Sequence, residues 1–118
     1  GEAMLFPAVA GADGTVALGP LVLRPRMAVQ SGPVKVAVRP EAWRIHRQGA
    51  GMLPARLDKR AYLGAVYEYT FETALGPIFV VSSDLDNVLA VGDEVQLSLG
   101  VHGVSVVGST EAARTNAE

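Results

Sequence analysis

Cysteine is absent from this chain of 118 residues, and two classes of protein are excluded with it. Without thiols there can be no disulfide framework and no thiolate metal site. The 10 basic and 12 acidic side chains give a net charge of −2 and a pI near 5.6. Because that balance provides no general attraction for phosphate polymers, nucleic acid is not expected as a partner.

Long apolar runs are missing as well. No segment approaches the roughly 18 apolar residues of a membrane-spanning helix, and no charged segment followed by an apolar one marks a signal peptide. Direct membrane insertion is therefore not expected. The sequence begins Gly1-Glu2-Ala3-Met4, without an initiator methionine, so we expect a piece of a longer protein.

The motifs of common enzymes are also missing. No G-x-x-x-x-G-K-[ST] loop is present to hold nucleotide phosphates. His46 and His102 lie far apart, with no nearby acidic cluster that would complete a metal site. We therefore expect no catalysis, and no cofactor or metal site in this chain.

What the chain does contain predicts an all-β protein. Half of the residues are apolar (49%), and 13 glycines and 7 prolines indicate many turns. Apolar side chains alternate with polar or small ones, as in half-buried strands. The positions expected to point inward are Val34, Val36, Val38, Val95, Leu97 and Leu99.

Three pairs of similar strings occur in the same order along the chain, which predicts two similar halves. The pairs are Met4–Val9 with Met52–Leu57, Ala17–Leu23 with Ala74–Val80, and Gly32–Val38 with Gly92–Ser98. We expect one module over residues 4–108, with halves at about 4–46 and 52–107. Segment 58–73 has no counterpart in the first half, and residues 109–118 are small and polar, so we expect a disordered tail there.

Turn residues divide these strands. Gly19-Pro20 and Gly76-Pro77 are predicted to separate strands, each marking a turn or a sheet edge, and segments 10–14 and 83–87 are predicted to be hairpin loops. Pro40 ends a strand, and one helical turn is expected at 41–45, with Trp43 packing back. Many short strands in two similar halves are typical of two small OB-like barrels, or of one sheet system with a pseudo-dyad.

Several local patterns resemble a known family. They are Leu5–Val9 with Gly19–Leu23, then Val36–Glu41, then Tyr62-Leu63-Gly64 with Glu68-Tyr69, and finally Gly76 and Val91–Val95. In this order they are similar to the transport-associated OB (TOBE) region of ATP-binding subunits of ABC importers, nearest to the polyamine and ferric-iron branch. The resemblance extends from about Leu5 to Val107.

The resemblance implies a C-terminal regulatory and dimerisation domain with an OB-like fold, on the cytoplasmic side and peripheral to the cell membrane. Its implied partners are the parent ATPase domain, the permease subunits and a second copy of the subunit. ATP and Mg²⁺ would bind in the parent domain, which this chain lacks. The implied motif and interface residues are Arg39, Pro40, Glu41, Tyr62, Leu63, Gly64, Tyr67, Glu68 and Tyr69.

Other interpretations of these residues remain open. Pro40 can simply stop a strand between solvated charges, and Tyr62-Leu63-Gly64 can be a glycine hinge with its neighbours in the core. Because segment 62–71 concentrates the tyrosines, we expect a two-fold contact through it or through the strands beside it. The alternative function is a free-standing OB-like module that binds a small oxyanion between its halves.

Overall fold

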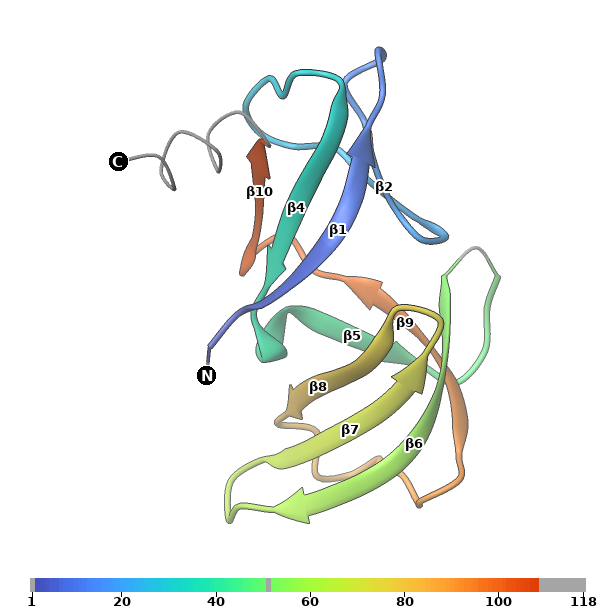
Figure 1. Cartoon of the computed structure of the whole chain (residues 1–118). Helices are drawn as coiled ribbons and strands as arrows, with labels where there is room; N and C mark the ends of the chain where they lie inside the picture. The colour runs from blue at the N-terminus through green and yellow to red at the C-terminus, as the bar shows by residue number, and fades with distance from the viewer. Residues whose placement is uncertain (1, 51, 109–118) are drawn as a thin grey trace.

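In the computed structural model, which describes residues 2–50 and 52–108, ten strands form two antiparallel five-stranded sheets (Figure 1). The single short helix of the described residues is a 3₁₀ turn, η1 (Pro40–Ala42), which lies where the chain leaves one sheet for the other. The predicted all-β, OB-like fold of two similar halves is confirmed. The predicted tail at 109–118 lies outside the described residues.

The first sheet, with the segments that join its strands, forms what we call the first lobe. The strands are β1 (Met4–Ala10), β2 (Val16–Leu18), β3 (Leu21–Leu23), β4 (Gly32–Val38) and β10 (Val104–Gly108). Their order across the sheet is β10-β4-β1-β2-β3. The first four are consecutive in the chain, whereas β10 joins them from the far end of the sequence.

The second sheet and its connections form the second lobe. The strands are β5 (Trp43–His46), β6 (Leu53–Tyr62), β7 (Tyr67–Thr73), β8 (Gly76–Ser82) and β9 (Glu94–Leu99). Their order is β5-β9-β6-β7-β8. The two sheets therefore have the same strand order when the strand numbers differ by five: β6 holds the position of β1, β7 that of β2, and so on, with β5 in the position of β10.

This numbering means that the two lobes exchange their last strands. β5 follows β4 in the chain but pairs with β9, and β10 follows β9 but pairs with β4. The strands compared in the sequence, β3 with β8 and β4 with β9, hold the same positions in the two sheets. Each predicted half of the chain thus contributes four strands to one sheet and its last strand to the other sheet.

Within each lobe the strands follow a Greek key, in which the fourth strand returns beside the first. One turn prediction is wrong for this reason: segment 83–87 is not a hairpin loop, because β8 and β9 are not neighbours in the sheet. Gly19-Pro20 is the turn between β2 and β3, and Gly76-Pro77 begins the edge strand β8 directly after the turn Ala74-Leu75, so both pairs separate strands as predicted.

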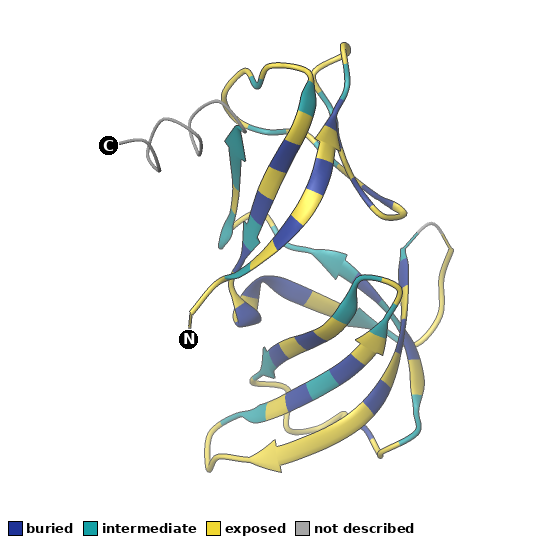
Figure 2. Ribbon diagram, in the orientation of Figure 1, coloured by how far each residue is buried: buried dark blue, intermediate teal, exposed yellow. Residues whose placement is uncertain are grey.

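The core follows the predicted alternation. Along β4 the buried side chains are Val34, Val36 and Val38, and along β9 Val95 and Leu97 are buried while Leu99 is half-buried. Figure 2 shows the resulting bands of buried and exposed residues along β1 and β4. The helical turn predicted at 41–45 is wrong beyond Ala42, because β5 begins at Trp43 and pairs with β9. Trp43 does pack back, edge-on against Phe6 with a 6.0 Å centroid distance.

Candidate functional site

The first predicted group, Arg39, Pro40 and Glu41, lies at the point where the chain crosses between the sheets. The backbone N–H of Arg39 donates to the Gly103 carbonyl at 2.9 Å. In return, the Gly100 N–H donates to the Ala42 carbonyl at 2.7 Å. These two hydrogen bonds join segment 39–42, which precedes β5, to segment 100–103, which precedes β10. We call this pair of segments the crossover.

Small residues permit the close approach at the crossover. A Cβ on Gly100 would lie 3.2 Å from the Ala42 carbonyl oxygen, and a Cβ on Gly103 would lie 3.1 Å from the Ala42 Cβ. Gly103 also has a φ of 83°, which side chains with a Cβ rarely adopt. The crossover thus depends on glycine at positions that the resemblance does not single out.

Side chains of the first group differ in exposure. Pro40 is buried, whereas Arg39 and Glu41 are exposed. η1 packs against β8, so the turn also reaches the far edge of the second sheet. The Arg44 guanidinium donates from Nη1 to the Glu41 carbonyl at 3.1 Å, and this contact holds the turn against β5.

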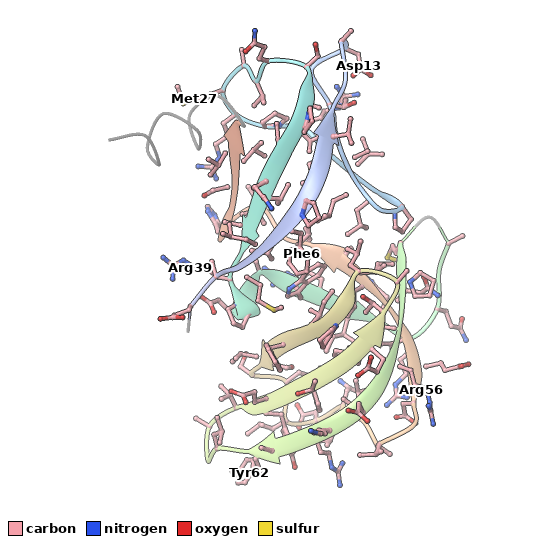
Figure 3. The ribbon with its side chains drawn as sticks, viewed as in Figure 1. Phe6, Asp13, Met27, Arg39, Arg56 and Tyr62 are labelled. Carbon is pink, nitrogen blue, oxygen red and sulfur yellow. The ribbon has the colours of Figure 1, made fainter. Side chains whose placement is uncertain are left out.

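The second predicted group lies on the β6–β7 hairpin. Tyr62, Leu63 and Gly64 form its tip, where the Leu63 N–H donates to the Val66 carbonyl and the Tyr62 hydroxyl donates to the Gly64 carbonyl. Figure 3 places Tyr62 at the far end of the second lobe and Arg39 beside the junction of the sheets. The structure therefore separates the hairpin tip from the crossover.

A row of aromatic rings runs from this tip into the core. Tyr62 contacts Tyr67, which stacks on Tyr69 with an interplanar angle of 8°, and Tyr69 contacts Phe71. Tyr69 and Phe71 are 1% and 0% exposed. The inner part of segment 62–71 is therefore core, and only its outer part can meet a partner: Tyr62, Leu63, Gly64, Glu68 and half-buried Tyr67.

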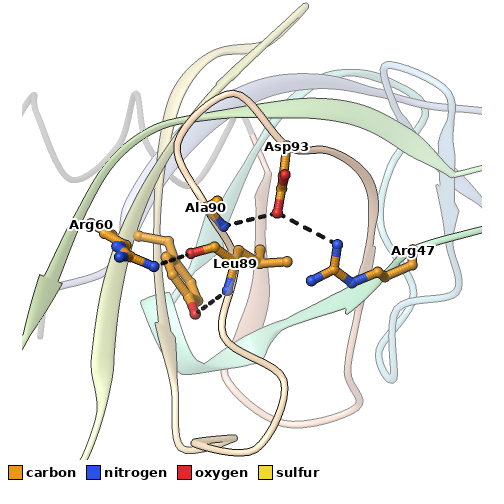
Figure 4. A network of polar contacts seen from close by, with 6 residues as sticks. Arg47, Arg60, Leu89, Ala90 and Asp93 are labelled. Carbon is orange, nitrogen blue, oxygen red and sulfur yellow. Dashed lines mark hydrogen bonds and ion pairs between the residues drawn. The ribbon is translucent and has the colours of Figure 1, made fainter.

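The segment between β8 and β9 closes the inner side of the second sheet. Leu89, 2% exposed, is fixed by both of its backbone groups: its N–H donates to the Tyr69 hydroxyl at 3.2 Å, and Arg60 donates to its carbonyl at 2.6 Å (Figure 4). The Asp93 carboxylate accepts from the Ala90 N–H at 2.8 Å and faces Arg47 at 3.5 Å. Leu89 is thus a plug held by side chains of two strands, β6 and β7, and Asp93 fixes the residue that follows it.

One groove brings parts of the two predicted groups together. It has a volume of about 620 Å³ and lies between the edge strands β5 and β8, which do not pair with each other. Glu41 and Tyr69 both line it, together with Arg44, Ser82 and Asn87. The buried Trp43, another lining residue, has an Nε1–H without a hydrogen-bond partner among the described residues.

An equivalent groove lies in the first lobe, between edge strands β3 and β10. Its volume is about 750 Å³, and segment 24–31 covers it as Leu89 and its neighbours cover the second lobe. Leu23, Val104 and Val106, which pack against the core, lie on its floor, and the covering segment contributes the half-buried Val29. Sequence reasoning missed both grooves, because neither comes from a contiguous motif.

Polar groups elsewhere are engaged in local turns. The amide of Asn87 donates to Asp84, and this hydrogen bond lowers the pKa of the Asp84 carboxyl. In the first lobe, hydrogen bonds from Thr15 lower the pKa of Asp13 in the same way. His46 hydrogen-bonds to Ser98 at 2.7 Å. Within residues 2–50 and 52–108, no three His, Asp or Glu side chains gather as metal ligands would.

With this geometry described, comparison with known proteins decides the family. The sequence model of the TOBE domain matches residues 36–107, which include the crossover and all of the second lobe. The chain belongs to the TOBE domain family. In the described part of the chain, no helix has the length and apolarity needed to cross a bilayer.

Curated relatives of this TOBE domain are ATP-binding proteins. The chain is 30% identical over 112 residues to the Fe(3+) ions import ATP-binding protein of Agrobacterium fabrum, covering 91% of this chain and 32% of the relative. It is 33% identical over 79 residues to the protein of the same name from Rhizobium meliloti, and the match covers 67% of this chain and 22% of the relative. It is 29% identical over 83 residues to the protein from Brucella abortus, and the match covers 70% of this chain and 24% of the relative. The chain thus spans a third or less of the length of these relatives, and it is homologous to a region of ABC importer ATP-binding subunits.

Proposed function

We propose that this TOBE domain is the C-terminal regulatory and dimerisation domain of the ATP-binding subunit of an ABC importer. The observation that carries the proposal is the match over residues 36–107 to a TOBE domain, together with similarity to Fe(3+) import ATP-binding proteins about three times as long. In such a subunit the domain has no catalytic role. ATP and Mg²⁺ bind in the ATPase domain, and the subunit acts at the cytoplasmic face of the membrane beside its permease.

The crossover supports a regulatory role. Because its two hydrogen bonds and two glycines fix one lobe against the other, the domain can transmit a contact made at one lobe to the other. We assign the exposed side chains of Arg39 and Glu41 to contacts with the rest of the subunit. Pro40 positions them by starting the 3₁₀ turn.

The exposed hairpin tip supports a second contact. Tyr62 and Leu63 are each 59% exposed, and they stand at the end of the longest strand of the described chain. Apolar side chains at such a tip contribute to an interface when a partner covers them. We assign Tyr62, Leu63, Gly64, Tyr67 and Glu68 to contacts within the transporter complex, and Tyr69 to the support of this hairpin from beneath.

The geometry of the β5–β8 groove does not favour binding of an oxyanion within the second lobe. Its two cations are already engaged: Arg44 with the carbonyls of Glu41 and Trp43, and Arg47 with Asp93. Two carboxylates, Glu41 and Asp84, also line the groove and would repel an anion.

Two measurements on the 118-residue chain test the proposal. Sedimentation equilibrium over a concentration series should show a reversible dimer, since a dimerisation domain needs a self-complementary surface. Calorimetry with Mg-ATP, sulfate and molybdate should detect no binding tighter than millimolar. A micromolar ATP or oxyanion site would contradict the proposal, as would a chain that stays monomeric at millimolar concentration.

A further inference from the structure

The two sheets present opposite chemistry on their outer faces. Val9 of β1 lies between Pro33 of β4 and Ala17 of β2 in the register of the first sheet. At the same place in the second sheet, Arg56 of β6 lies between Glu94 of β9 and Glu72 of β7. One fold position is therefore filled by three apolar residues in one lobe and by three charges in the other.

The apolar character extends over the whole outer face of the first sheet. Residues that alternate with the buried ones point outward on each strand. On β1, β2 and β3 these are Leu5, Pro7, Val9, Ala17 and Val22. On β4 and β10 they are Pro33, Lys35, Ala37, Ser105 and Val107. We call these residues the outer face; Lys35 is its only charged member.

Three large apolar side chains of the outer face are strongly exposed to solvent. Leu5, Val9 and Val22 are 63%, 58% and 69% exposed. Proteins rarely leave a contiguous apolar patch on their surface unless another molecule covers it. The cross-strand charges of Arg56 with Glu72 and Glu94 show how the same fold makes this face soluble when it is not covered.

We infer that the outer face is the surface through which two copies of this chain pair, an inference that rests on the dimerisation proposed above. A nearly uncharged, apolar sheet face is complementary to a copy of itself, and two twisted sheets pack face to face at about −30° and ~10 Å separation. A two-fold axis through this contact makes it closed and isologous.

The size of the outer face sets the strength of the pair. Seven residues of β1 at ~3.3 Å each and four strand spacings of ~4.8 Å give a footprint of at most roughly 440 Å², since β2, β3 and β10 are shorter than β1. Stable interfaces bury about 800 Å² per partner, and smaller ones belong to weak complexes. We therefore expect a reversible dimer of this isolated chain with a dissociation constant in the micromolar range or weaker.

Lys35 makes the prediction specific to self-pairing. In a two-fold contact, two copies of this ammonium enter the same interface, and no carboxylate of the outer face neutralises them. Their repulsion opposes association, although the long stem allows each ammonium to reach the rim. Lys35→Leu is expected to tighten the dimer severalfold, whereas a partner that offers a carboxylate to Lys35 would be lost in this variant.

Sedimentation equilibrium of matched variants tests the inference. Val9→Glu places a carboxylate at the centre of the outer face, and because each substitution occurs twice in a two-fold dimer, association should weaken at least about tenfold. The control is Val91→Glu, at a similarly exposed position of the second lobe (62% exposed), which should leave association unchanged, and Leu63→Glu tests the hairpin tip separately. Thermal unfolding by circular dichroism checks that all of these variants are folded.

Each result has a distinct meaning. A dimer weakened by Val9→Glu and tightened by Lys35→Leu supports the outer face. A wild-type dimer that persists in Val9→Glu but is lost in Leu63→Glu overturns the outer face and moves pairing to the hairpin tip, with the proposed function intact. A wild-type chain that is monomeric at millimolar concentration overturns both self-pairing and the dimerisation part of the proposed function.

Discussion

β2 and β3 of the first lobe have three residues each, whereas β7 and β8, which hold the same positions in the second lobe, have seven each. The covering segments differ in the same direction. The second lobe holds Leu89 by two hydrogen bonds. In the first lobe, the described hydrogen bonds of segment 24–31 are limited to one long contact of 3.4 Å from Arg26 to the Val101 carbonyl.

The two lobes therefore share one strand order but differ in strand length and in how firmly their covering segments are held. The second lobe holds its covering segment by hydrogen bonds and places opposite charges in cross-strand positions on its outward side, so it is suited to a stable support. The first lobe has shorter strands, a loosely held covering segment and an apolar outer face, and regions with few such contacts open at lower free energy. We therefore expect the surface for self-pairing on the first lobe, whereas the hairpin tip of the second lobe is assigned to other contacts within the transporter complex.

The largest expected effect concerns the two covering segments. Leu89→Ala removes a side chain that is 2% exposed, and the free energy of unfolding should fall by about 2–5 kcal/mol. Val29→Ala, at the half-buried plug of the first lobe, should lower it by only about 1 kcal/mol or less. Urea unfolding followed by Trp43 fluorescence measures both. Equal losses would show that the lobes are closed equally well.

A smaller effect is expected at the crossover, where the lobes are tied together. Gly103→Ala forces an alanine into a φ of 83°, which costs about 1–2 kcal/mol. It also crowds the Ala42 Cβ at 3.1 Å. The matched control is Gly64→Ala, with a φ of 94° and no atom within 4 Å of the new Cβ, so it carries the conformational cost alone.

The unfolding free energies from denaturant titrations separate these contributions. We expect Gly103→Ala to be the more destabilising variant, and its transition to become broader if the lobes begin to unfold separately. If Gly64→Ala costs as much as Gly103→Ala, close packing at the crossover contributes nothing measurable.

The strands, the core and the equivalence of the halves could be predicted from the sequence because they depend on local alternation and on repeated strings. Val34, Val36 and Val38 point inward because every second residue of a strand does so. The exchange of β5 and β10 could not be predicted, because alternation says which face of a strand is buried but not which sheet receives it. The hairpin misassigned to 83–87 has the same origin.

For the candidate site, the family resemblance named residues of the crossover turn and of the hairpin, but not the residues that support them. Leu89, Arg60 and Gly103 act through backbone contacts with residues distant in the sequence, and such contacts leave no motif. Tyr69 was expected at an interface and lies in the core, because its position on β7 points inward beside Phe71. The repeat offered one signal for Gly103, since segment 100–103 follows β9 as 39–42 follows β4.

The smallest expected effect tests a property that the lobes share. Hydrogen bonds from Thr15 in the first lobe and from Asn87 in the second lower the pKa of Asp13 and of Asp84 below the ordinary value of 3.8. A carboxyl whose pKa is lowered by folding contributes stability above its unfolded pKa, and this contribution is lost as the pH falls through the folded value. Thr15→Val removes the hydroxyl donor and leaves the backbone donor at 3.0 Å, so the pKa of Asp13 should rise part of the way to 3.8.

Asn87→Ala should raise the pKa of Asp84 in the same partial way, because the backbone N–H groups of Asp86 and residue 87 still donate to that carboxylate. Each substitution should leave the other aspartate unchanged, since the two carboxyls belong to turns of different lobes. Titration of the carboxyl ¹³C resonances by NMR between about pH 2 and 6 measures both groups in one sample. A changed pKa of Asp13 in the Asn87→Ala variant, or of Asp84 in the Thr15→Val variant, would mean that the crossover transmits structural changes from one turn to the other. The lobes would then be coupled more tightly than their separate hydrogen-bond networks imply.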